Sequence, residues 1–89
     1  MITTRISEFI QDELGVKMMG EMHISARVND RDMLLLDMFN YQIEIDFESG
    51  YVDISPKDGC SLGLFELAQI NKIVNNLDDI KYIWENDEE

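Results

Sequence analysis

A strict alternation of apolar and polar residues between Tyr41 and Ser55 constrains the fold of this chain more than any other feature. In its first half, apolar residues occupy the odd positions and polar residues occupy the even positions. Successive side chains of a β-strand point to opposite faces, so this pattern predicts a strand with one buried face. A Ser-Gly pair then interrupts the alternation, which resumes and predicts a β-hairpin.

The register of this hairpin follows from a two-residue turn at Ser49–Gly50. In that register Ile45 faces Ile54, and the apolar pairs all lie on one side of the hairpin. A slip by one residue would set Ile45 against Asp53, which would place a carboxylate among apolar side chains. We therefore expect the register with the two-residue turn.

The polar side of the hairpin carries the candidate partner-binding residues. Glu44, Asp46 and Glu48 are expected to point to solvent, each about 6.6–7 Å from the next along the strand. Asp53 is expected opposite Asp46 on the same face. Successive phosphates of a nucleic-acid strand are about 6–7 Å apart. These acids could therefore imitate nucleic acid in a basic protein groove, or they could simply form a solvated face.

The rest of the chain predicts helices on both sides of the hairpin region. Apolar residues at helical spacing indicate a helix over about Thr4–Leu14, which Gly15 ends. Alternation over Glu21–Val28 predicts a further strand. After the hairpin, Ser61 can cap a helix. Its apolar stripe is expected to contain Leu64, Leu67, Ile70, Val74 and Leu77.

The segment 33–39 is ambiguous, because its apolar residues would occupy both faces of a strand. We expect a strand, since the preceding turn chemistry at 29–32 invites pairing with the strand before it; a short helix stays open as the alternative. Met33, Leu35 and Phe39 would lie on the opposite face from Leu34, Leu36 and Met38, and one of these two sets would lack cover in so small a protein. That set offers a surface for homodimerisation.

These elements predict an α+β fold in a single domain, residues 1–89. An antiparallel sheet of three or four strands would lie between an N-terminal and a C-terminal helix. A length of 89 residues fits one domain.

The net charge of the chain limits the kinds of partner that it can bind. Nineteen acidic residues against seven lysines and arginines leave a formal charge of −12. Such a surface repels nucleic acid and anionic membranes, so we expect neither as a direct partner. No apolar run is long enough for a membrane span, and no signal peptide is recognisable, which predicts a cytoplasmic protein.

No catalytic, cofactor or metal motif stands out, so we expect no enzyme activity. Cys60 precedes a helix and His23 is the only histidine. A small packed cysteine and a strand histidine explain both better than a nucleophile and its base. The acidic stretch 46–50 does not match the spacing of a calcium loop.

In layout and charge the chain resembles small acidic phage-encoded anti-CRISPR proteins, which block Cas9 by imitating DNA. The likeness covers the order of the elements and the acidic hairpin with Glu44, Asp46, Glu48 and Asp53, and it involves no sequence motif. The layout is also similar to the double-stranded RNA-binding domain, whose basic contact residues are missing here. Small acidic immunity proteins, which neutralise cationic nuclease toxins, resemble the chain in charge.

The resemblance and the charge together lead us to expect a non-enzymatic inhibitor. It would bind a basic nucleic-acid-binding protein, such as a Cas nuclease, by mimicking nucleic acid. Two alternatives stay open. One is a phage or prophage structural or assembly protein that acts as a homodimer through the strand 33–39. The other is an immunity protein to a cationic nuclease toxin.

Overall fold

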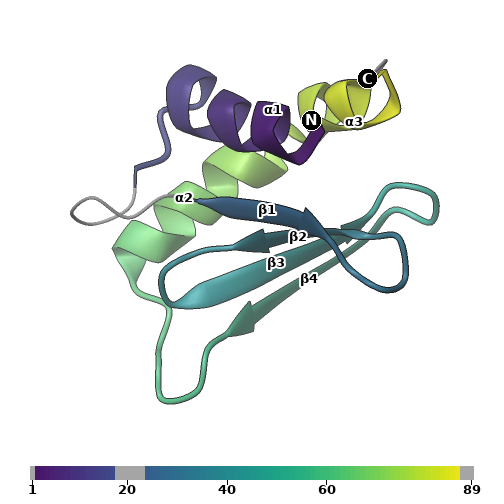
Figure 1. Ribbon diagram of the computed structural model, residues 1–89. Helices are drawn as coiled ribbons and strands as arrows, with labels where there is room; N and C mark the ends of the chain where they lie inside the picture. The colour runs from purple at the N-terminus through teal and green to yellow at the C-terminus, as the bar shows by residue number, and fades with distance from the viewer. Residues whose placement is uncertain (1, 18–23, 87–89) are drawn as a thin grey trace. The chain divides into compact units, whose positions relative to one another are not determined.

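In a computed structural model, residues 2–17 and 24–86 are described, and they contain one antiparallel sheet of four strands (Figure 1). The strands are β1 (Ser25–Val28), β2 (Leu34–Asp37), β3 (Tyr41–Asp46) and β4 (Tyr51–Pro56), and they lie side by side in chain order. A helix precedes the sheet and two helices follow it. The predicted α+β class is confirmed, with four strands and a second C-terminal helix.

The chain divides into two compact units. One unit joins residues 1–17 to residues 63–89 and holds the helices, and the other spans residues 18–62 and holds the sheet. The sheet unit therefore forms a continuous insertion between the two helical segments. The single domain expected for residues 1–89 stays a prediction.

The hairpin of β3 and β4 forms as expected, but its register differs from the predicted one by two residues. Ile43 pairs with Ile54 and Ile45 pairs with Val52. The loop contains four residues, Phe47–Gly50, because a hydrogen bond from the Gly50 N–H to the carbonyl of Asp46 (2.9 Å) closes it. A shift by two positions keeps each side chain on its predicted face. Only its partner across the hairpin changes.

The segment 33–39 contains a strand, as expected, rather than a helix. β2 lies inside the sheet and pairs with β1 on one side and with β3 on the other. Its backbone is thus unavailable for pairing with a second copy. Of the two apolar sets, Leu34, Leu36 and Met38 are buried. In the other set Phe39 is 49% exposed and Leu35 is half-buried, but Met33 is buried.

The strand predicted over Glu21–Val28 is observed as the shorter β1, and its residues 21–23, including His23, lie outside the described residues. Ile24 is buried, whereas Val28, expected on the buried face, is 45% exposed. Asn29 forms the turn that follows, since its side-chain oxygen accepts the N–H groups of Arg31 and Met33 (both 2.9 Å).

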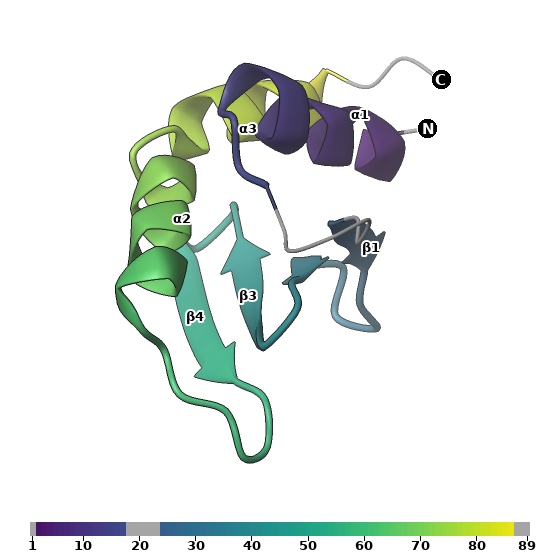
Figure 2. The same cartoon turned by 90° about the vertical axis from the view of Figure 1, so that its left-hand side faces the viewer.

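The N-terminal helix starts as α1 (Ile2–Glu8) and continues as one π-helical segment, η1 (Phe9–Glu13). The Leu14 N–H donates to the carbonyl of Phe9 (3.1 Å). Gly15 then adopts a left-handed conformation with φ of +70° and ends the helix, as predicted. In the same unit α1 contacts α3 (Leu77–Glu85), and the two lie side by side in Figures 1 and 2.

The C-terminal helix is two helices, α2 (Leu64–Val74) and α3 (Leu77–Glu85), separated by Asn75 and Asn76. Gly63, rather than the expected Ser61, occupies the N-cap position of α2. The buried Gln69 anchors α2 within the helical unit, because its Nε2 donates to the carbonyl of Lys17 (2.6 Å).

The expected apolar stripe of α2 is wrong in most of its members. The buried residues are Gln69, Ile70 and Ile73, whereas Leu64 is 86% exposed and Leu67 is 48% exposed. Helical spacing identified a stripe, but α2 is apolar on more than one side. The fold buries the side that carries the two isoleucines.

Candidate protein-binding site

The outward face of the β3–β4 hairpin brings three of the four predicted site residues together. Glu44 and Asp53 are directly opposite each other, rather than Asp46 and Asp53 as expected. Asp46 follows two residues after Glu44 on the same strand and pairs with Tyr51. All three carboxylate side chains belong to half-buried residues on the polar face. We call Glu44, Asp46 and Asp53 the acidic face.

The fourth predicted residue lies elsewhere. Glu48 is exposed in the loop between β3 and β4 and does not continue the row along β3. The predicted row of three evenly spaced acids is therefore wrong. The two acids of β3 stand about 6.6–7 Å apart along the strand, and Asp53 lies beside Glu44 rather than in line with them.

Asp46 shapes the loop. Its carboxylate accepts hydrogen bonds from the Glu48 N–H (3.0 Å) and from the Ser49 hydroxyl (2.9 Å). Asp side chains commonly stabilise turns in this way. Neutral donors therefore hold this carboxylate in place.

Neutral donors also hold the other two carboxylates. The Asn29 side-chain amide donates to Glu44 Oε2 (2.8 Å), and the Ser55 hydroxyl donates to Asp53 Oδ2 (2.7 Å). Within the described residues, no lysine or arginine forms an ion pair with a member of the acidic face. The long-range contact of Asn29 was not predicted, although the turn chemistry around it was.

An ion pair in the sheet unit involves other residues than the acidic face. Lys57 Nζ lies 2.7 Å from Asp37 Oδ1 and also donates to the carbonyl of Met38 (2.8 Å). This contact ties the residue after β4 to the end of β2. Lys57 is thus engaged with Asp37 rather than with the acidic face.

Placing Glu44 opposite Asp53 costs free energy of folding. Side chains directly opposite in an antiparallel pair have Cβ atoms about 4.5–5.5 Å apart, and like charges there destabilise the sheet. In water the repulsion amounts to about 0.5–1 kcal/mol. A basic partner that approaches this face would relieve the repulsion.

The remaining candidates do not assemble a reactive site. Cys60 was expected to be packed, but it is a free, exposed cysteine in the loop before α2. Among residues 2–17 and 24–86, no group of three or more potential metal ligands is present. No helix within these ranges is long and apolar enough to cross a membrane.

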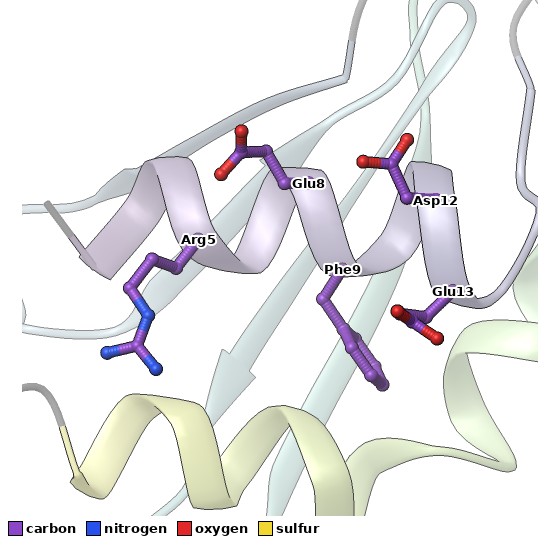
Figure 3. Close-up of a pocket in the computed structure, with 5 residues that line it drawn as sticks. All are labelled: Arg5, Glu8, Phe9, Asp12 and Glu13. Atoms are coloured by element: carbon purple, nitrogen blue, oxygen red, sulfur yellow. The ribbon is translucent and has the colours of Figure 1, made fainter.

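One shallow cavity of about 310 Å³ lies along the N-terminal helix (Figure 3). Its lining combines Arg5 with the aromatic ring of Phe9 and three acids, Glu8, Asp12 and Glu13. In Figure 3 the Glu8 and Asp12 carboxylates point to one side of the helix, and the Phe9 ring points to the other. The lining residues diverge rather than converge on a common point.

Comparison with known proteins found no matching family model, no matching curated protein and no matching solved structure.

Proposed function

We propose that this chain is a non-enzymatic inhibitor that binds the basic nucleic-acid-binding surface of another protein. The observation that carries the proposal is the acidic face, in which Glu44 and Asp53 are direct neighbours and Asp46 adjoins them. The groups that donate hydrogen bonds to these carboxylates are neutral. Lysine and arginine side chains of a nucleic-acid groove offer the complementary charge.

The proposed partner class includes Cas nucleases and cationic nuclease toxins, because both carry such grooves. The net charge of −12 would speed the encounter with a basic partner. Salt would weaken the complex, since the Debye length falls from about 10 Å at 0.1 M to about 3 Å at 1 M. DNA would compete with the chain for the groove.

The test uses capture of the partner on the immobilised full chain from a lysate of its host, with elution by a salt gradient. The purified partner is then titrated with the chain in the presence and absence of duplex DNA. We expect competition with DNA, and for the double variant Glu44→Gln/Asp53→Asn an affinity at least about tenfold weaker, or about 1.4 kcal/mol.

The matched control is Asp30→Asn/Asp58→Asn. This control also removes two negative charges, but from exposed loop positions of the same unit. It should change the affinity for the partner less than threefold, or about 0.65 kcal/mol. Equal losses of affinity in both double variants would show that binding depends only on the net charge of the chain and not on the acidic face. An affinity for the partner that stays the same when duplex DNA is added would contradict the proposal.

A further inference from the structure

The outward side of α2 is apolar although it faces solvent. Leu64 is 86% exposed, Leu67 48% and Val74 40%, and Ala68 is exposed as well. The opposite side of the same helix is buried through Gln69, Ile70 and Ile73. Exposed apolar side chains gathered on one side of an element commonly mark an interaction surface.

The spacing on this side is that of a helix-pairing seam. Leu64, Leu67, Asn71 and Val74 follow each other at intervals of three, four and three residues. This interval pattern places side chains on one stripe that can interlock with a second helix. An asparagine among the apolar seam residues is a known means of setting the register between two identical helices.

Charge favours a second copy of this chain as the occupant of the seam. Between Gly59 and Leu77 the only charged residues are Glu66 and Lys72, so this stretch is neutral within a chain of charge −12. The Glu66 carboxylate is turned back to accept the Gly63 N–H (2.8 Å). Two strongly anionic copies can therefore approach each other here without opposing carboxylates.

We infer that the chain forms a homodimer through α2, with the seam of Leu64, Leu67, Asn71 and Val74 at its centre. This contact differs from the dimer expected through strand 33–39, whose backbone is fully paired within the sheet. A helix of eleven residues is about 16 Å long. We expect a contact limited to so short a helix to bury less than the about 1,200 Å² of a standard interface, and the dimer to be weak.

The test measures the mass of the full chain by sedimentation at concentrations up to about 1 mM. We expect a monomer–dimer equilibrium that shifts toward dimer when NaCl rises from about 0.1 M to about 1 M, because salt screens the repulsion between the copies. This response is opposite to that of the proposed complex with a basic partner. A monomer throughout the range would overturn the inference.

Two variants address the seam directly. Leu64→Glu, at an almost fully exposed position, should lower the association constant at least about tenfold while the circular dichroism spectrum stays unchanged. Asn71→Leu should raise it, because an apolar residue replaces a polar one within the seam. The matched control is Tyr82→Glu, which adds the same negative charge at a 69% exposed residue of α3, outside the seam. It should lower the association constant only through the added repulsion between the two copies, and therefore less than Leu64→Glu does. Equal effects of Leu64→Glu and Tyr82→Glu, or no effect of Asn71→Leu, would contradict the inference.

Discussion

The β3–β4 hairpin and helix α2 each bury one face and expose the other, yet their exposed faces are opposite in character. The hairpin presents Glu44, Asp46 and Asp53, without a paired cation in the described residues. The helix presents Leu64 and Leu67 in a neutral stretch. Apolar packing determines the buried faces but neither exposed face, although Asp46 and Glu44 also accept hydrogen bonds from nearby turns. The two exposed faces are therefore where we place two different interactions.

The two regions also differ in how they use glycine. Gly50 closes the hairpin loop with φ of +80°, a conformation that costs other residues about 1–2 kcal/mol. Gly63 caps α2 with φ of −97°, which any residue adopts. The hairpin thus depends on its glycine, and the helix does not.

The largest change in the free energy of unfolding is expected when a side chain of a buried face is shortened. Ile43→Ala removes a fully buried side chain from the inner face of β3 and should lower the free energy of unfolding by about 2–5 kcal/mol. Val74→Ala, on the exposed side of α2, should change it by less than about 0.5 kcal/mol. Urea unfolding followed by circular dichroism measures both. Similar losses would show that the assigned faces are wrong.

A smaller effect is expected at the hairpin loop. Gly50→Ala should lower the free energy of unfolding by about 1–2 kcal/mol, because a Cβ at this position contacts nothing within 4 Å and the cost is conformational. Gly50→Asn should lose less, since asparagine tolerates the left-handed region. Thermal unfolding would reveal the order of the two variants. An alanine variant as stable as the parent would exclude this loop geometry.

Neutralising the acidic face should stabilise the protein slightly. Glu44→Gln or Asp53→Asn should each raise the free energy of unfolding by about 0.5–1 kcal/mol at low salt, because each removes the same repulsion. The double variant should therefore gain little over either single one. High salt should reduce the gain. Fully additive gains would mean that the two carboxylates do not interact.

The smallest effect is expected at the start of α2. Gly63→Ser should raise stability by a few tenths of a kcal/mol, because serine caps a helix somewhat better than glycine. The new Cβ would lie 3.1 Å from Glu66 Oε1, and that flexible carboxylate must move slightly. A melting temperature higher by about 1–2 °C is expected. A clear loss would show that the contact between Glu66 and the Gly63 N–H matters more than the cap.

Much of the candidate site could be predicted because strand alternation is local. The side of the sheet occupied by Glu44, Asp46 and Asp53 follows from the two-residue period of β3 and β4. The pairing of Asp53 with Glu44 could not be predicted, since a shift by two residues leaves Ile43, Ile45, Val52 and Ile54 on the inner face. The Asn29 amide reaches Glu44 across fifteen positions of the chain, which no local pattern describes.

The amino-acid sequence by itself determined the α+β class, the helix end at Gly15 and the sides of the hairpin. These features depend on interactions between residues a few positions apart. Tertiary structure decided the four-residue loop, the placement of Glu48 in it and the burial of Ile70 and Ile73 instead of Leu64 and Leu67. The reason is that α2 has apolar residues on several sides, and only packing against other parts of the fold selects the one that leaves water.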